Sequence, residues 1–187
     1  MHSENPVIQA LEDSFWVKLA LYAVFAVGSA VLVLKSSAGT AFAADPLKGA
    51  SYGFIIAVTA IVMFHVSLQD RCRRNSRVVL VLGGLVGHLL MVRAVMGLVD
   101  VGSIPEIFRF FAVPFALAPM LHGVLLGRAV ASFSVVYVTL IGCLLVPQGE
   151  VLPYMILSLV CGMTSVLLAY QVRKRLQLLQ AGIYVGA

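Results

Sequence analysis

The side chains that could do chemistry in this sequence are a few charged or titratable groups inside long apolar runs. They are His65, His88, Arg93, Arg109 and His122. An ionisable side chain within a membrane span is a candidate for function by default, because burying it in lipid is costly. Glu106 precedes Arg109 at the spacing of helical neighbours. Arg93, Glu106 and Arg109 are therefore the candidates for an ion-pair cluster or a ligand site.

These three residues have two interpretations. In the first, both arginines reach the outer membrane surface, where Asp100, Glu106 and Glu150 are available as partners. The resulting belt of ion pairs would fix the depth and the packing of the helices. In the second, the arginines form a site for an anionic ligand that arrives from outside. We favour the first interpretation.

The histidines and cysteines show no pattern of a metal site. There is no HExxH motif, no His-x-His and no CxxC, and no carboxylate lies within one helical turn of His65, His88 or His122. We interpret the histidines as hydrogen-bonded packing residues. No Ser/His/Asp arrangement, phosphate-binding loop or His-Asp dipeptide is present. We therefore predict no metal, no cofactor and no enzymatic activity for this chain.

Two prolines interrupt the fourth apolar run, within Phe108-Arg-Phe-Phe-Ala-Val-Pro-Phe-Ala-Leu-Ala-Pro-Met120. A proline inside a helix removes a hydrogen bond and displaces the carbonyl four residues earlier. Pro114 and Pro119 are thus candidate hinge residues. Broken helices also line the substrate sites of transporters, or serve only as packing kinks.

The third run contains Gly83, Gly84 and Gly87, whose spacing favours close contact between helices.

The composition defines the elements that must position these residues. Of the 187 residues, 61% are hydrophobic and 11% are charged, and the mean hydropathy is +1.02. A soluble domain has about a quarter charged residues. This excludes a soluble enzyme, a disordered regulator and a nucleic-acid-binding domain. We predict an all-α integral membrane protein whose main partner is the lipid bilayer.

Six apolar runs reach, or come near, the length of about 20 residues that a helix needs to cross the bilayer. We expect a cytoplasmic segment over residues 1–15, a six-span bundle over 16–172, and a cytoplasmic basic segment with the start of a truncated seventh helix over 173–187. Ala41-Phe42-Ala43 resembles a signal-peptide cleavage site, but the acidic residues before the first run favour a retained anchor. The six spans are predicted at Trp16–Leu34, Tyr52–Leu68, Val78–Val99, Ile107–Leu126, Ala129–Val146 and Val151–Val172.

Two basic clusters predict the orientation. Lys and Arg accumulate on the cytoplasmic side of membrane proteins, so we expect a cytoplasmic N-terminus and a bacterial inner-membrane location. Anchoring explains the clusters better than recognition of anionic lipid does. The clusters are Arg71, Arg73, Arg74 and Arg77 after the second span, and Arg173, Lys174 and Arg175 after the sixth.

Three stretches resemble a known family. They are Val113-Pro-Phe-Ala-Leu-Ala-Pro-Met-Leu121, Leu-Leu-Gly-Arg-Ala129, and Gln171-Val-Arg-Lys-Arg-Leu-Gln-Leu-Leu-Gln-Ala-Gly182. Together they resemble the membrane region of the seven-transmembrane receptors with an intracellular HD hydrolase. The resemblance implies a metal-dependent phosphodiesterase of cyclic di-AMP in the full-length chain. Here the loop Lys35–Lys48 is too short for the family's outer domain, and the HD domain is absent.

The resemblance predicts a membrane module that anchors such a hydrolase and transmits a signal to it. A cytoplasmic HD domain of the same longer chain would be its partner, and the sequence leaves homo-oligomerisation open. A different class also fits six spans in this length: the vitamin-capture subunit of an energy-coupling-factor transporter, or a small cell-shape membrane protein. In the transporter, the site would surround Arg93, Glu106 and Arg109.

Overall fold

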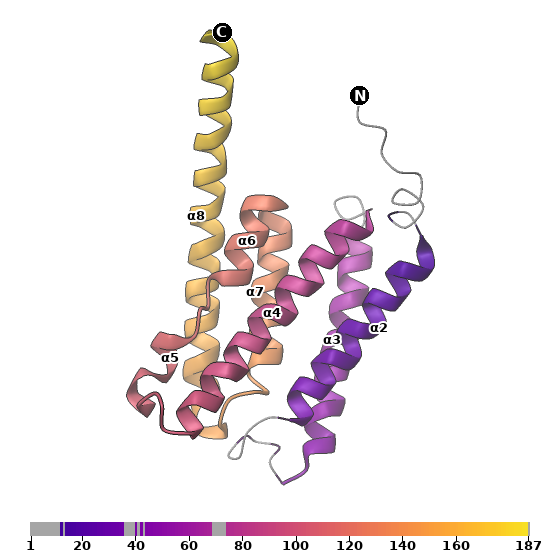
Figure 1. Cartoon of the computed structure of the whole chain (residues 1–187), viewed down its shortest axis with the longest axis vertical. Helices are drawn as coiled ribbons and strands as arrows, with labels where there is room; N and C mark the ends of the chain where they lie inside the picture. Colours follow the sequence, from indigo (N-terminus) through magenta and orange to yellow (C-terminus); the bar gives the residue numbers. More distant parts are fainter. Residues whose placement is uncertain are drawn as a thin grey trace.

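The computed structural model of the chain is a bundle of helices, as the composition predicts (Figure 1). It describes the backbone of residues 12, 14–35, 40, 42, 44–68 and 74–186, and side chains as far as residue 169 and at 171. Outside the helices, Thr40 and Pro147 form an isolated β-bridge. The elements are α2 (Phe15–Leu34), α3 (Pro46–Leu68), α4 (Asn75–Asp100), η1 (Glu106–Phe108), α5 (Arg109–Ala112), α6 (Leu117–Leu125), α7 (Arg128–Gly142), η2 (Gln148–Glu150) and α8 (Val151–Gly186).

Five helical segments are long and apolar enough to cross a membrane. They are Phe15–Leu34, Pro46–Leu68, Asn75–Asp100, Glu106–Leu125 and Gln148–Ala169. The remaining pass is α7, a shorter apolar helix of 15 residues. Many large apolar side chains point outward, such as Trp16 (76% exposed) and Phe111 (87% exposed). Water would not tolerate so many exposed apolar groups, so this is a multi-pass membrane protein whose outer surface contacts lipid.

Helices α4 and α7 form the centre of the bundle. Helix α4 packs against α2, α6 and α7, and α7 packs against α3, α4, α6 and α8. Their inward faces are lined by fully buried aliphatic side chains such as Leu85, Leu89, Val138 and Ile141. The short α7 is therefore enclosed by protein over most of its surface.

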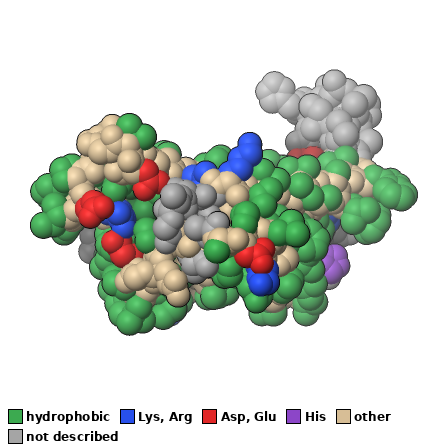
Figure 2. Space-filling view, turned by 90° about the horizontal axis from the view of Figure 1, so that it is seen from below, with side chains coloured by type: hydrophobic (Ala, Val, Ile, Leu, Met, Phe, Trp, Pro, Cys, Tyr) green, Lys and Arg blue, Asp and Glu red, His purple; other side chains and the backbone are tan. Residues whose placement is uncertain are grey.

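Charged residues separate between the two ends of the bundle. We call one end the acidic end, because it carries Asp45, Asp100, Glu106 and Glu150, together with Lys35, Lys48 and Arg109. It is the lower end in Figure 1 and faces the viewer in Figure 2, where red side chains lie among green ones. The opposite, basic end carries Arg74, Arg77 and Arg128. The predicted basic residues that lie outside the described side chains are Arg71, Arg73, Arg173, Lys174 and Arg175.

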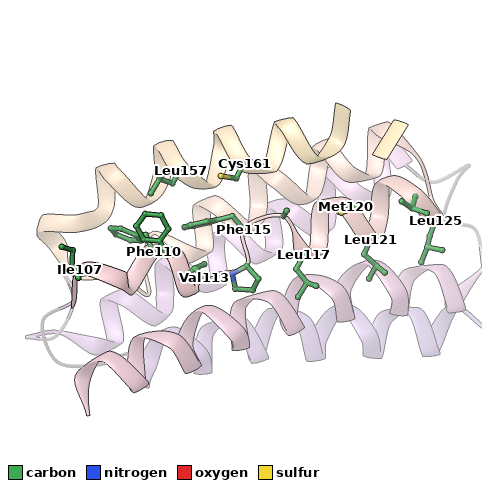
Figure 3. A pocket seen from close by; sticks show the side chains of 14 residues that line it. Ile107, Phe110, Val113, Phe115, Leu117, Met120, Leu121, Leu125, Leu157 and Cys161 are labelled. Atoms are coloured by element: carbon green, nitrogen blue, oxygen red, sulfur yellow. The ribbon is translucent and has the colours of Figure 1, made fainter. Parts of the chain in front are cut away.

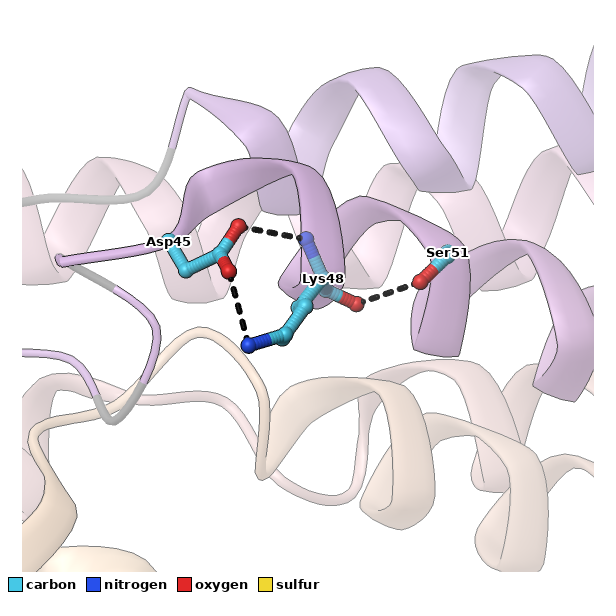
Figure 4. Close-up of polar contacts among 3 residues, drawn as sticks. All are labelled: Asp45, Lys48 and Ser51. Atoms are coloured by element: carbon cyan, nitrogen blue, oxygen red, sulfur yellow. Dashed lines mark hydrogen bonds and ion pairs between the residues drawn. The ribbon is translucent and has the colours of Figure 1, made fainter.

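A local capping arrangement explains why α3 begins at Pro46. The backbone N–H of Lys48 donates to Asp45 Oδ1 at 3.3 Å, and Lys48 Nζ lies 2.9 Å from Asp45 Oδ2 (Figure 4). Asp45 thus satisfies a free N–H of the first turn, and proline suits the first helical position. The side-chain and backbone hydrogen bonds from Lys48 lower the pKa of Asp45. The cap consequently keeps its charge throughout the neutral range.

Helix α8 continues without a break from Val151 to Gly186, over 36 residues. At about 1.5 Å per residue its length is about 54 Å. Its first part, up to Ala169, belongs to an apolar span. The rest projects past the other helices at the basic end (Figure 1). The predicted sixth span and the tail after it therefore share one helix.

Candidate functional site

Arg109 is the centre of an ion-pair cluster at the acidic end. Its Nη1 contacts Glu150 Oε1 at 2.5 Å, and its Nη2 lies 3.8 Å from Glu106 Oε1. The arginine side chain is 8% exposed, whereas Glu150 is 36% and Glu106 is 86% exposed. Its Nε has no partner among the described residues. The guanidinium is thus held by two carboxylates from different parts of the chain.

Two short 3₁₀ turns bring these carboxylates to the arginine. Glu106 opens η1 directly after Pro105, three residues before Arg109. Glu150 closes η2 after Pro147, at the start of α8. The predicted pairing of Glu106 with Arg109 is present, and Glu150 also pairs with Arg109, at a shorter distance from the guanidinium.

Arg93 makes no ion pair with any described residue, so the structure does not bring all three predicted residues together. Their ligand role stays a prediction.

The fourth membrane pass is interrupted in its middle. Helix α5 ends at Ala112 and α6 begins at Leu117, with non-helical backbone between them. In this joint Val113 is extended (φ −77°, ψ 121°), and the Phe115 N–H donates to the Val113 carbonyl at 2.9 Å. Pro114 lies inside the joint and cannot donate to the carbonyl of Phe110.

Pro119 has a different place from the one that the sequence predicts. It lies in the first turn of α6, where backbone N–H groups have no helical acceptor in any case. Its missing N–H therefore costs the helix no hydrogen bond. Of the two candidate hinge residues, only Pro114 occupies the break itself.

A groove of about 900 Å³ lies beside this joint. It is formed by η1, α5, the joint and α6 on one side and by α8 on the other, and its fourteen lining residues are apolar or, at Cys161, a thiol. Figure 3 shows these side chains arranged along the groove from Ile107 to Leu125. Helix α6 packs against α8, whereas α5 packs against α4 and η1.

Aromatic rings pack together beside the joint. The Tyr154 ring centroid lies 5.4 Å from that of Phe115 and 6.4 Å from that of Phe110. Tyr154 is completely buried, and its hydroxyl lies against Gly142, where an added Cβ would meet it. A large side chain of α8 thus packs against both α5 and the joint.

His122 joins three helices near the basic end. Its Nδ1 lies 2.5 Å from Ser134 Oγ of α7, and its Nε2 lies 3.2 Å from the carbonyl of Leu80 in α4. The Leu80 oxygen can only accept, so Nε2 donates. His122 is fully buried. It is a hydrogen-bonded packing residue, in line with the interpretation of the sequence.

The other two histidines differ from that interpretation. His88 is fully buried in α4, and neither ring nitrogen has a hydrogen-bond partner among the described residues. His65 is exposed, with its ring 6.5 Å from Tyr22 in an edge-on arrangement. No group of three or more His, Cys, Asp or Glu residues in the described part of the chain could hold a metal ion.

The predicted packing by the glycines of the third run is wrong for Gly83 and Gly87. An added Cβ at either position would meet no atom within 4 Å. Gly84 is the glycine that makes a close contact, because the imidazole of His122 occupies the place of its missing side chain. Spacing alone did not show which of these neighbouring glycines faces the bundle.

Sequence reasoning missed Ser134 and placed Glu150 only among several available carboxylates. Ser134 is one of two serines, with Ser132, in the fifth apolar run, and no pattern distinguishes it from the other hydroxyls. Glu150 lies 41 residues after Arg109, so only the tertiary packing of the chain, and no local spacing, shows that they pair.

Comparison with known proteins gives one match. The model of the family described as "7TM receptor with intracellular HD hydrolase" matches residues 46–187. No curated protein and no solved structure matches the chain. The matched region begins at the first residue of α3 and includes the ion-pair cluster, the broken pass and α8.

Proposed function

The chain belongs to the seven-transmembrane receptors with an intracellular HD hydrolase, and from this we propose that it is the anchoring and signal-transmitting membrane module of a cyclic-dinucleotide phosphodiesterase. The 187 residues hold the membrane region of the family and no HD domain. Catalysis would belong to a further domain of a longer chain. The proposed substrate of that domain is cyclic di-AMP.

The unbroken helix α8 supports this function best. It packs against α6 and α7 within the bundle and then continues past it to Gly186. A continuous helix transmits rotation and translation along its axis, because its turns are hydrogen-bonded to one another. A change at the bundle would therefore reach a domain attached after α8.

The segregation of charge supports an orientation. We place the basic end in the cytoplasm, since Lys and Arg accumulate there. Arg74, Arg77 and Arg128 lie at this end, and α8 leaves the bundle on the same side. The acidic end would then face away from the cytoplasm, in agreement with an inner-membrane receptor of a bacterium.

The joint at Val113–Ala116 is our candidate for the movable element. A signal shifts a receptor only if the ligand prefers one of two arrangements of it. Val113 is extended and the Phe115 N–H bonds only two residues back, so α5 and α6 do not form one continuous helix and α5 can reposition relative to α6 at low cost. Phe110 and Phe115 both pack on Tyr154 of α8, which would couple such a change to the output helix.

Insertions into α8 test the proposal. In the full-length protein, one to four alanines, or seven, are inserted after Gln171, and hydrolysis of cyclic di-AMP is measured in membranes. Each residue adds about 100° of rotation, so seven residues restore the phase to within about 20°. We expect activity to change with one to four residues and to return with seven. Equal activity in all insertions would contradict transmission through α8.

A second result would favour the transport alternative. If the purified chain retained a vitamin in stoichiometric amount and the full-length protein showed no hydrolysis of cyclic di-AMP, the signalling proposal would be wrong. The site of such a transporter would be sought around Arg93, Glu106 and Arg109. The family match covers the residues of this site without assigning a ligand to them.

A further inference from the structure

The groove beside the broken pass has the length of a lipid chain. Its lining extends from Ile107 near the acidic end to Leu125 near the basic end (Figure 3). A helix rises about 1.5 Å per residue. Nineteen positions of mostly helical backbone therefore cover nearly the whole hydrocarbon core, which is about 30 Å thick.

The walls of the groove select a hydrocarbon occupant. The described residues of its lining offer no charged side chain, hydroxyl or amide over this whole length. Leu117, Met120 and Leu157 on the two sides are between 37% and 46% exposed, so they are open to a guest molecule. An apolar chain would gain contact with them and with the rings at the joint.

The polar end of the groove carries an excess of negative charge. Arg109 is buried and already held by two carboxylates, whereas Glu106 is 86% exposed and only 3.8 Å from the arginine. An ionised carboxylate accepts several hydrogen bonds, so Glu106 has free acceptor capacity. Asp100 is exposed at the same end. The headgroup of the guest should therefore carry a donor with positive charge.

We propose that this groove binds phosphatidylethanolamine from the leaflet at the acidic end. An acyl chain would lie along α6 and α8, and the ammonium group would contact Glu106. An anionic headgroup would meet exposed carboxylates, while the one guanidinium is buried beneath them. A second copy of the chain fits poorly, because a two-fold dimer would place a concave surface against itself. The proposal is independent of the signalling function.

Tryptophan fluorescence tests the occupant. The chain has one tryptophan, Trp16, so Trp16→Phe gives a silent background. Leu117→Trp then places a reporter in the groove, and Val160→Trp places a control on α8 outside the groove lining, where Val160 is 58% exposed. Both variants are reconstituted in phosphatidylcholine vesicles that contain brominated phosphatidylethanolamine or brominated phosphatidylglycerol, whose bromines quench the fluorescence.

We expect phosphatidylethanolamine to quench the groove reporter with about threefold higher relative affinity than phosphatidylglycerol, the size expected for a partly exposed ion pair. The control reporter should not distinguish the two lipids. Adding Glu106→Gln, at an exposed position where folding is not at risk, should remove the preference.

Three results would overturn the proposal. Equal affinities of both lipids at the groove reporter would mean ordinary lipid contact. A preference for phosphatidylglycerol would mean that the arginine selects the headgroup. Absence of quenching by either lipid would mean that protein fills the groove, and cross-linking through Cys161 would then test for a second copy.

Discussion

At the scale of single residues, the Arg109 cluster shows one guanidinium paired with two carboxylates that differ in distance and in exposure. Glu150 and Glu106 carry the same charge. The contact between Arg109 and Glu150 is short, and Glu150 is only partly exposed, whereas the contact between Arg109 and Glu106 is long, and Glu106 is largely exposed. Coulomb attraction falls with distance and with the effective dielectric constant. Glu150 therefore contributes most of the stabilisation.

Substitution of the two glutamates measures this difference. Glu150→Gln leaves a buried guanidinium with one distant partner, so we expect a loss of about 2 kcal/mol in the free energy of unfolding, between the values for exposed and buried pairs. Glu106→Gln should cost about 0.5 kcal/mol. Unfolding in mixed micelles with increasing sodium dodecyl sulfate gives both values. Equal losses would contradict the proposed roles.

Gly84 provides a second test at this scale, with Gly83 as its matched control. An added methyl group at residue 84 collides with His122, which is fixed by its contacts with Ser134 and Leu80. We expect Gly84→Ala to destabilise the protein by about 2 kcal/mol. Gly83→Ala meets no neighbour and should stabilise helix α4 by up to about 1 kcal/mol.

The same unfolding assay compares the two glycine variants. If both alanine substitutions stabilised the protein, His122 would not occupy the position described here. The pair also shows the limit of sequence reasoning. Gly83 and Gly84 cannot be told apart by residue type, but their positions differ by about 100° around the helix axis, so only one of them faces His122.

At the scale of elements, the existence of a break in the fourth pass could be predicted and its position only in part. Proline excludes a regular helix interior, which indicated an interruption between Phe108 and Met120. The sequence did not show that α6 restarts two residues before Pro119. The residues around Pro119, in the first turn of α6, and around Pro114, in the break, give no sequence signal that tells the two positions apart. The packing of this pass against α8 determines where the helix breaks.

The two prolines should therefore differ when each is replaced by alanine in the full-length protein. Pro114→Ala restores a backbone N–H that can donate to the Phe110 carbonyl, so α5 can extend into the joint. We expect the activity of the attached hydrolase, or its response to a signal, to change about fivefold or more, as in typical coupling between sites.

Pro119→Ala is the control for this comparison, since its position demands no hydrogen bond. We expect activity within twofold of the unaltered protein, by the same hydrolysis assay in membranes. An effect of Pro119→Ala as large as that of Pro114→Ala would move the hinge from the joint to the first turn of α6.

At the scale of the whole molecule, composition was sufficient to predict the class. The low charge and the length of the apolar runs predicted a helical membrane protein, and the structure confirms it. The contacts between helices could not be predicted, because apolar contacts are not directional and an apolar helix face does not specify which other helix it packs against. For that reason Glu150, Ser134 and the groove only became evident from the packing.

Labelling of cysteines tests the orientation of the molecule. Ser76 and Ser103 are exposed near opposite ends of α4. In a background with Cys72, Cys143 and Cys161 replaced by serine, an impermeant maleimide should label Ser103→Cys in intact cells. Ser76→Cys should react only after permeabilisation. The reverse pattern would place the basic end outside and would contradict the positive-inside interpretation.

The place of α7 determines which part of the molecule senses the thickness of the bilayer. With 15 residues, α7 is about 22 Å long, shorter than the hydrocarbon core. Neighbouring helices enclose it on most sides, so few lipids meet its short span. Hydrophobic mismatch therefore acts on peripheral helices such as α2 and α3, whose 20 and 23 residues match an ordinary membrane. A thinner or thicker membrane would change the tilt of these peripheral helices and leave α7 in place.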